Sequence, residues 1–296
     1  MKQMLLVFSA VLALAASSAF AQQEHEHETP QPPRLKWSFA GPFGKYDQAQ
    51  LQRGFKVYKE VCSNCHSLNM VSFRNLADAG GPGFSMAQAE AVAAEYKVKD
   101  GPNDQGEMFE RPGRLADHFP PPFPNDQAAR SANGGALPPD MSVLAKARTY
   151  ERGFPWFLFD IFTQYQEQGP DYIVAILKGY AEKPKDMVMP AGMNFNTFFP
   201  GHAIGMPAPL SDNQVQFDDG TPGTIDQAGK DAAAFLTWAA EPHLVARKRL
   251  GLQVMIFLIV LSGLLYFTKK KVWHDVHAHP ELLGGQATKE PKLTRS

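Results

Sequence analysis

The spacing of apolar residues along this chain predicts a mainly α-helical protein. Over residues 48–65 apolar side chains recur every three or four positions, which is the period of one face of a helix. Asp47 and Gln50 have the spacing of a capping box, so this helix is expected to begin near Gln48. Its apolar face consists of Leu51, Phe55, Tyr58 and Cys62. The first helix therefore carries an apolar face that ends at a cysteine.

A second strong helical pattern covers residues 224–240, which are rich in alanine. Thr224 and Gln227 have capping-box spacing, and Pro242 is expected to end the helix because proline cannot continue it. We expect this helix to pack across the first one, with Phe235 buried in the contact.

Weaker patterns predict shorter helices over residues 85–96, 140–150 and 171–178. Pro170 is expected at the first position of the last of these, and Gly179 in a left-handed conformation just after its end. Glycine and proline pairs or runs predict irregular or extended loops elsewhere. These loops are expected at residues 119–125, 130–140 and 186–210.

Both ends of the chain carry long apolar runs. Residues 1–21 combine a basic start, an apolar core and a small-x-small pattern at their end, which predicts a cleaved signal peptide. Residues 250–267 contain no charge and, at 1.5 Å per residue, would span roughly 27 Å, close to the hydrocarbon thickness of a membrane. Basic triplets at 247–249 and 269–271 flank this run, which favours a transmembrane helix over a buried core helix.

These features predict four parts: a signal peptide (1–21), a periplasmic domain (22–245), a transmembrane helix (246–268) and a cytoplasmic tail (269–296). The signal peptide sets the orientation, so we expect a single-pass protein of a bacterial inner membrane. The formal net charge is −1, which gives no basic surface for nucleic acid.

The two cysteines of the chain lie in one motif, Cys62-Ser63-Asn64-Cys65-His66. Two thiols at this spacing can each add to a vinyl group of a haem, and the histidine that follows then binds the iron. A zinc site would need a second pair of ligands at finger spacing. A thioredoxin-like motif expects a βαβ context and does not need the histidine. The motif therefore predicts one covalent haem c per chain.

Electron transfer by such a haem requires a second axial ligand from the protein, and a methionine in that place raises the potential. A ligand methionine should lie in a rigid loop. Met189 and Met206 both precede a proline, and Met206 also follows Gly205. Met206 is therefore preferred, although spacing alone leaves other methionines open. These are Met70, Met86, Met108, Met141, Met187 and Met193.

Longer stretches carry a specific resemblance over about residues 37–271. They are the C-x-x-C-H motif, RSANGGALPPDMS (130–142), FPGHAIGMPAPL (199–210), FDDGTP (217–222), WAAEP (238–242) and the C-terminal anchor. Together they closely resemble the cytochrome c1 family, the haem subunits of the cytochrome bc1 complex. The signal peptide is similar to that of proteobacterial members.

The resemblance implies a mainly α, class-I-type cytochrome c haem domain with long loops. It implies thioether bonds from Cys62 and Cys65 and axial ligation by His66 and Met206. The remaining residues that it implies around the haem are Arg130, pairing with a propionate, and Ala136, Leu137, Pro138 and Pro139, forming a wall. Some bacterial relatives have an extra cysteine pair that stiffens the domain, and this chain does not. The resemblance therefore leaves open how the Met206 loop is held.

The same resemblance implies a non-catalytic subunit of ubiquinol–cytochrome c oxidoreductase. It would relay electrons from the Rieske iron–sulfur protein through haem c to a c-type cytochrome, beside a cytochrome b subunit and membrane lipid, in a dimeric complex. A haem subunit of a terminal oxidase is the alternative. A haem peroxidase or sensor would need a distal residue, for which His118 and His202 are the candidates.

Two further segments carry expectations. Acidic residues at 100–110 and at Asp218-Asp219 could form a docking face for a basic cytochrome, although solvated loops are nearly as good an interpretation. The aromatic segment 153–168, which is longer than in mitochondrial members, is expected to pack in the core rather than to face a partner.

Overall fold

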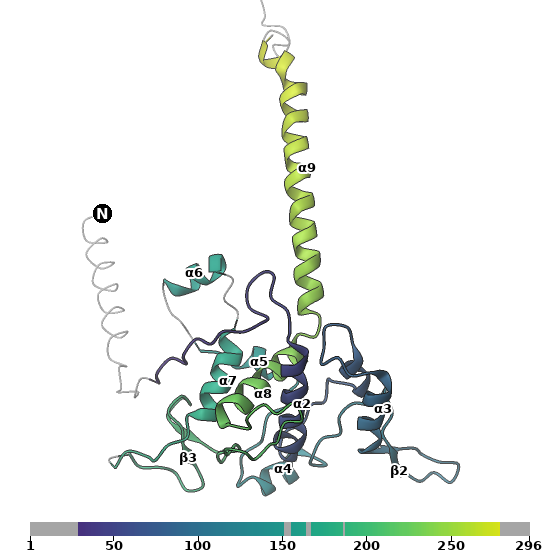
Figure 1. Ribbon diagram of the computed structural model, residues 1–296, viewed down its shortest axis with the longest axis vertical. Helices are drawn as coiled ribbons and strands as arrows, with labels where there is room; N and C mark the ends of the chain where they lie inside the picture. Colours follow the sequence, from purple (N-terminus) through teal and green to yellow (C-terminus); the bar gives the residue numbers. More distant parts are fainter. Residues whose placement is uncertain (1–28, 151–154, 164–166, 186, 279–296) are drawn as a thin grey trace, which may run out of the picture. The chain divides into compact units, whose positions relative to one another are not determined.

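The computed structural model describes residues 29–150, 155–163, 167–185 and 187–278. The chain divides into two compact units, Met1–Val245 and Ala246–Ser296. Within the described residues the structure is mostly helical, as the sequence predicts (Figure 1). The expected signal peptide and most of the expected cytoplasmic tail lie outside the described residues.

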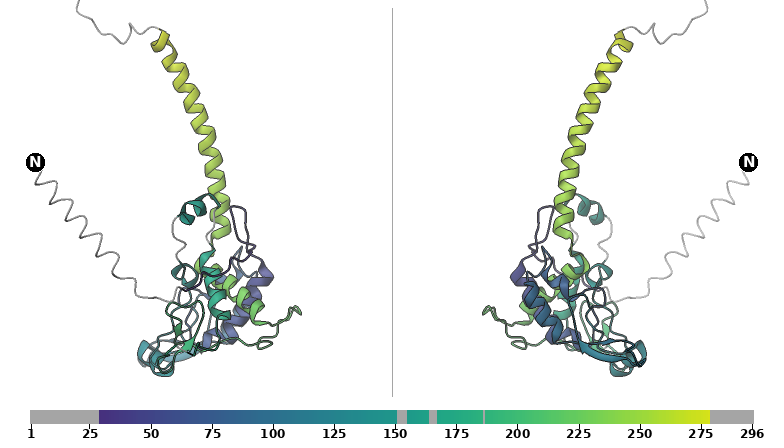
Figure 2. Two further views of the ribbon diagram at one scale, coloured as in Figure 1. Left: turned by 90° about the vertical axis from the view of Figure 1, so that its left-hand side faces the viewer. Right: turned by 90° about the vertical axis from the view of Figure 1, so that its right-hand side faces the viewer.

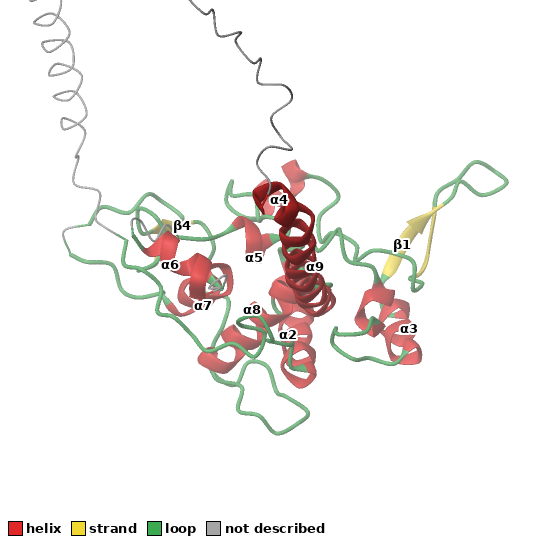
Figure 3. Cartoon of the chain, turned by 90° about the horizontal axis from the view of Figure 1, so that it is seen from above, coloured by secondary structure: helices red, strands yellow, loops and turns green. Residues whose placement is uncertain are grey.

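In the described residues helices dominate, accompanied by two short antiparallel hairpins (Figures 1 and 3). The helices are α2 (Gln48–Glu60), α3 (Met86–Ala94), α4 (Asp126–Ala132), α5 (Leu144–Ala147), α6 (Trp156–Thr163), α7 (Gln168–Lys178), α8 (Ile225–Ala240) and α9 (Leu244–Ala278), with 3-10 turns η1 (Cys62–Asn64) and η2 (Phe73–Ala77). The strands are β1 (Lys97–Asp100) paired with β2 (Phe109–Pro112), and β3 (Asn194–Phe195) paired with β4 (Ala203–Ile204).

The first predicted helix is present as α2. The Asp47 carboxylate accepts hydrogen bonds from the backbone N–H of Ala49 (2.9 Å) and Gln50 (3.3 Å), which caps the helix start. The α-helix ends at Glu60, however, so Cys62 begins the 3-10 turn after it and Cys65 directly follows that turn. Ser63 Oγ donates to the carbonyl of Lys59 (2.7 Å), and such side-chain bonds compete with the next helical turn.

The second predicted helix is α8, and its contact with α2 is the most extensive between any two described elements. The helices are in close contact at Gly54, where a Cβ atom would lie 2.0 Å from the Asp231 carbonyl oxygen. Phe235 is fully buried, with its ring 5.7 Å from that of Phe55 and 5.8 Å from that of Tyr58. The predicted crossing and the buried Phe235 are both confirmed.

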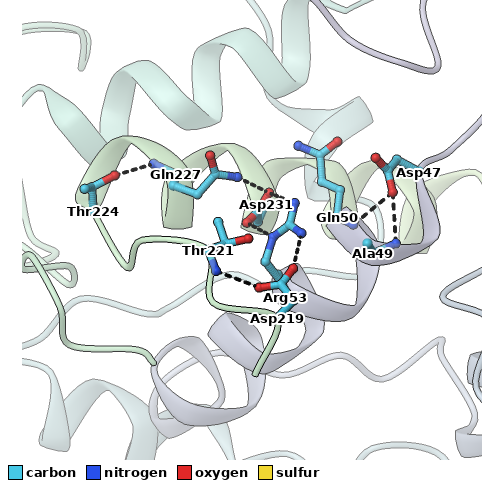
Figure 4. A network of polar contacts seen from close by, with 9 residues as sticks. All are labelled: Asp47, Ala49, Gln50, Arg53, Asp219, Thr221, Thr224, Gln227 and Asp231. Atoms are coloured by element: carbon cyan, nitrogen blue, oxygen red, sulfur yellow. Dashed lines mark hydrogen bonds and ion pairs between the residues drawn. The ribbon is translucent and has the colours of Figure 1, made fainter. Parts of the chain in front are cut away.

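Buried charge also joins α2 to α8 (Figure 4). Arg53 on α2 donates from Nε to Asp231 Oδ2 (2.7 Å), and Gln227 donates to the other oxygen of that fully buried carboxylate (2.8 Å). Arg53 Nη1 donates to Asp219 in the loop before α8 (2.7 Å). Removing one partner of a buried pair typically costs about 3–5 kcal/mol, so this network fixes the register of the crossing.

Helix α7 corrects two expectations about its ends. It begins at Gln168, so Pro170 occupies the third helical position rather than the first. Proline is tolerated there because the first four N–H groups of a helix have no partner within it. Gly179 ends the helix with φ −80°, not in the left-handed region. Glycine is needed for space instead, because a Cβ atom there would lie 2.6 Å from Asn196 Oδ1.

Three predicted segments are partly different in the structure. The loop expected from residue 130 begins after Ala132, because α4 extends through Arg130 from its Asn125 cap. The loop expected at 186–210 contains the β3–β4 hairpin. The short helix expected at 140–150 is reduced to the four residues of α5.

The aromatic segment contradicts the expected core position. In α6, Trp156, Leu158 and Phe159 are 52%, 42% and 53% exposed. Phe154 and the side chains of Phe157 and Phe162 lie outside the described part of the chain. The described apolar side chains of α6 therefore form a surface patch.

Helix α9 contains the predicted transmembrane run. Within the stretch Leu244–His274, an 18-residue window has a mean hydropathy of 2.3, and none of that window is buried inside the structure. By length and composition it can cross a membrane. The helix is longer than the predicted 246–268, because it begins at Leu244 and continues through the basic triplet 269–271 to Ala278.

The α2–α8 crossing yields a stability prediction. Gly54→Ala should lower the free energy of unfolding by about 1–3 kcal/mol, because the added methyl group must push apart backbone atoms of the facing helix. Gly229→Ala in α8 is the matched control, since its nearest neighbour would lie at 3.8 Å. It should be neutral or stabilising by up to about 1 kcal/mol, because alanine favours helix. Thermal unfolding of the detergent-purified chain measures both, and equal melting temperatures would contradict a tight crossing.

Candidate functional site

The histidine of the C-x-x-C-H motif is buried and oriented by one hydrogen bond. His66 is 8% exposed, and its Nδ1 lies 2.8 Å from the carbonyl oxygen of Pro139. A carbonyl can only accept, so Nδ1 carries the proton and Nε2 keeps its lone pair. Burial lowers the pKa of His66 and outweighs the opposing effect of the Pro139 bond. The ring is therefore neutral near pH 7, as a metal ligand must be.

The chain after His66 is joined to the segment after Pro139 by a set of short hydrogen bonds. The Asp140 carboxylate accepts from Ser67 Oγ (2.8 Å) and from the Asn69 backbone N–H (2.9 Å). The Met141 N–H donates to the Ser67 carbonyl (2.9 Å). We call this pairing of residues 66–70 with residues 139–142 the histidine brace.

The Asp140 carboxylate is the charged member of the histidine brace. Its burial raises the pKa, but the hydrogen bonds from Asn69, Ser142 and Ser67 together outweigh this and lower the pKa of Asp140. The group is therefore ionised at neutral pH, and bonds to an ionised acceptor are stronger than neutral ones. Buried Ser142 adds a bond from the Met70 N–H to its Oγ (3.0 Å).

The two cysteines sit in one tight turn with the histidine. The Cys62 carbonyl accepts from the N–H of Cys65 (3.1 Å) and of His66 (2.9 Å). Cys62 is half-buried against the core and Cys65 is exposed. Burial raises the pKa of the Cys62 thiol to about 12, so in the free chain it remains a neutral thiol. The turn places two thiols and one imidazole at the end of α2.

The loop that carries Met206 is held without a disulfide. Tyr180 Oη donates to the Met206 carbonyl (3.0 Å), and Asn194 Nδ2 donates to the same oxygen (3.4 Å). Burial raises the pKa of Tyr180, which keeps its hydroxyl protonated as a donor. Asn196, fully buried, donates from Nδ2 to the Ile176 carbonyl of α7 (2.7 Å). These bonds fasten the β3–β4 hairpin and the loop after it to α7.

The Met206 loop also meets the loop that holds His66. A Cβ atom on Gly205 would lie 3.1 Å from Ala136 Cβ, so glycine permits this close approach. Ala136 belongs to the same loop as Pro139, whose carbonyl orients His66. Residues far apart in sequence are thus brought together through the loop between α4 and α5.

A family model described as the Cytochrome C1 family matches residues 37–276. The chain is 48% identical over 272 residues to cytochrome c1 of Blastochloris viridis, which covers 91% of this chain and 96% of the relative. The chain belongs to the cytochrome c1 family. It is also 48% identical over 241 residues to cytochrome c1 of Rhodospirillum rubrum, covering 81% of this chain and 86% of the relative.

A longer relative has a different organisation. The chain is 61% identical over 277 residues to a protein named cytochrome b/c1 from Bradyrhizobium diazoefficiens, covering 92% of this chain. The chain spans only 40% of the length of that relative. The cytochrome c1 region therefore occurs there as part of a longer polypeptide.

The other residues predicted around the site of this cytochrome c1 family member lie on one loop and its preceding helix. Arg130 is exposed in the last turn of α4, where its Nη1 donates to the Gly135 carbonyl (3.2 Å). Ala136, Leu137 and Pro138 are half-buried, and Pro139 is exposed although its carbonyl holds His66.

The other candidate ligand methionines and the two candidate distal histidines lie in different surroundings. Met141 is buried in the main core, whereas four methionines are exposed: Met70, Met86, Met108 and Met193. His118 Nδ1 lies 2.5 Å from the Asn69 carbonyl, and His202 Nδ1 lies 3.2 Å from the Asn196 carbonyl. Each histidine thus contacts a backbone carbonyl of a loop through one ring nitrogen.

Asp140, Ser142 and Tyr180 were missed by the sequence analysis as residues that shape the site. Asp140 and Ser142 could have been found from their place directly after the predicted haem wall, because an Asp-x-Ser sequence often forms local turn bonds. Tyr180 gives no such signal, because its contact to Met206 spans 26 residues.

The histidine brace yields the second prediction. Asp140→Ala removes an ionised acceptor from two bonds that cross between segments, and each such bond contributes about 1.5–3 kcal/mol. We expect a clearly lower melting temperature of the purified chain. Asp104→Ala, which alters an exposed carboxylate in the β1–β2 connection, is the control and should have no effect. If the two variants have the same melting temperature, Asp140 does not stabilise the histidine brace.

Proposed function

We propose that this chain is the electron-transfer subunit of a ubiquinol–cytochrome c oxidoreductase. In that role it relays electrons from the Rieske iron–sulfur protein through a covalently bound haem c to a c-type cytochrome. The observation that carries the proposal is the buried His66, whose Nδ1 is committed to Pro139 while the same loop contacts the Met206 segment. Membership of the cytochrome c1 family supports it.

The donor set of the site fits a haem c. Cys62 and Cys65 would form the thioether bonds, and His66 and Met206 would be the axial ligands, one imidazole and one thioether. The apolar side chains of the loop between α4 and α5 would pack on the ring, and Arg130 would pair with a propionate. That wall comprises Ala136, Leu137, Pro138 and Pro139. When bound, the haem supplies reversible one-electron redox chemistry.

The protein residues act by fixing both axial ligands. The Pro139 carbonyl holds the His66 tautomer and makes the imidazole a better electron donor. Tyr180 and Asn194 hold the backbone carbonyl of Met206 by two hydrogen bonds. A site with two protein ligands in place has no open position for a substrate, which favours electron transfer over peroxidase or sensor chemistry.

The proposed partners follow from the family. They are a cytochrome b subunit, the Rieske protein, a c-type cytochrome and membrane lipid, in a dimeric complex. The name of the Bradyrhizobium relative, cytochrome b/c1, supports association with a cytochrome b. The predicted signal peptide and the apolar α9 support a chain anchored in the inner membrane with its haem domain in the periplasm.

Fewer carboxylates remain for the proposed acidic docking face than the sequence indicated. Asp218 pairs with Lys56 (2.8 Å), and Asp219 shares Arg53 (2.7 Å) with the buried Asp231, so both carboxylates already have a cationic partner. Asp100 pairs with Arg111. The exposed carboxylates that remain in the β1–β2 hairpin are Asp104, Glu107 and Glu110, the last opposite Lys99 across the strands. Asp104 and Glu107 are therefore the best candidates for electrostatic steering.

The ligand assignment is tested by two matched substitutions. Met206→Leu should leave haem covalently attached but lower its midpoint potential and allow carbon monoxide to bind, because the thioether ligand is lost. Met189→Leu, at the other Met-Pro sequence, should change neither property. Redox titration and carbon monoxide difference spectra of the purified chain decide between them. If Met189→Leu alone lowers the potential and allows carbon monoxide to bind, the sixth ligand is Met189 and not Met206.

The docking face is tested by charge reversal. Asp104→Lys with Glu107→Lys should slow reduction of a basic cytochrome at low salt, and Asp104→Asn with Glu107→Gln should slow it by less. Both losses should shrink as ionic strength rises toward 0.1 M, where the Debye length is about 10 Å. The midpoint potential and quinol-linked reduction should stay unchanged. Stopped-flow kinetics over a salt series provide the measurement, and slowing that does not depend on salt would contradict this docking face.

A further inference from the structure

Helix α6 exposes a patch of large apolar side chains that the electron-transfer role does not explain. Its sequence, WFLFDIFT, contains one charged residue. The three exposed apolar side chains, at 42–53% exposure, belong to Trp156, Leu158 and Phe159. Figures 1 and 2 show α6 standing apart from the ribbons of α7 and α8.

Both ends of the segment that carries α6 are clamped to one place in the unit. Thr149 Oγ1 donates to Gln168 Oε1 (2.8 Å), which joins the chain before α6 to the start of α7. At Gly169 a Cβ atom would lie 1.7 Å from the Ala145 carbonyl, so α5 and α7 are in direct contact. Helix α6 therefore projects from the contact between α5 and α7 as a closed loop.

That contact lies beside the start of the membrane helix. Lys146 of α5 forms an ion pair with Glu241 (3.2 Å), which directly follows α8. Leu244, the first residue of α9, is 6% exposed and belongs to the main core. The uncharged run begins at residue 250, and six residues of helix rise only about 9 Å. The base of the α6 loop is thus tied by short connections to Leu244, six residues before the uncharged run of α9 begins.

The shape of the patch fits a lipid surface better than a protein groove. Successive helical residues differ by about 100° around the axis, so positions 156, 158 and 159 do not form one narrow stripe. A groove accepts a stripe at spacings of three, four and seven. A bilayer interface accepts apolar contacts over a wide arc, and it favours aromatic side chains, tryptophan above all.

We propose that α6 is an interfacial membrane helix that inserts Trp156, Leu158 and Phe159 into the outer leaflet of the bilayer. It would give the haem-bearing unit a second attachment to the membrane and limit its rotation about the start of α9. The proposal depends on α9 crossing a membrane. It does not depend on any proposed electron-transfer partner.

The test uses the full haem-loaded chain in vesicles of phosphatidylcholine and phosphatidylglycerol. Cys62 and Cys65 would be consumed by haem, so an introduced cysteine offers a single thiol for a fluorescent label. Leu158→Cys reports on α6, Val188→Cys is the exposed control at 90% exposure, and Leu258→Cys in α9 reports insertion of the anchor. Each label is challenged with doxyl-labelled lipid and with aqueous iodide.

The expected result is at least twofold stronger doxyl quenching at Leu158→Cys than at Val188→Cys, with the reverse order for iodide. Iodide quenching at Leu158→Cys equal to that at Val188→Cys would overturn the proposal, because α6 would then lie in water. Protection from both quenchers would also overturn it, because it indicates a protein contact such as a second copy. The Leu258→Cys label reports a failed anchor, and the haem spectrum of each sample reports the proposed function separately.

Discussion

The structure depends on the close crossing of α2 and α8. Gly54 lets the two backbones approach until no side chain fits between them, and Arg53 and Gln227 donate hydrogen bonds to the buried Asp231 carboxylate. A buried carboxylate without such partners would be costly, so the helices are stable in one register only. Phe235, packed on Phe55 and Tyr58, fills the space beside the crossing.

The site is built outward from that crossing. The turn with both cysteines and His66 follows the end of α2 directly, so the position of α2 sets the position of the motif. A smaller core cluster lies on another side of the crossing, where Leu210, Val215 and Phe217 pack against Val57 of α2 and against alanines of α8. This cluster anchors the chain just after the Met206 loop. The positions of both proposed axial ligands therefore depend on the same pair of helices, α2 and α8.

The hydrogen bonds of the site form two groups, each of which holds a different segment. Asp140 and Ser142 tie the chain after His66 to the loop between α4 and α5, while Tyr180 and Asn194 tie the Met206 backbone to the elements around α7. Main-chain acceptors and donors take part in nearly all of these bonds. Such bonds fix backbone position with little dependence on neighbouring side chains, which is an alternative to a disulfide for holding a ligand loop.

The sequence by itself determined the strong helices, the C-x-x-C-H motif and the apolar anchor, because each depends on residues close together in the chain. Caps at Asp47 and Thr224 and the period of apolar residues are local signals, and α2 and α8 follow them. Only the tertiary structure decided which carbonyl orients His66, what holds Met206, and that Asp218 and Asp219 are paired with α2. It also moved the aromatic α6 from the expected core to the surface, since hydrophobicity along a chain does not reveal whether other segments have already filled the core. These contacts join residues far apart in sequence, and no local pattern encodes them.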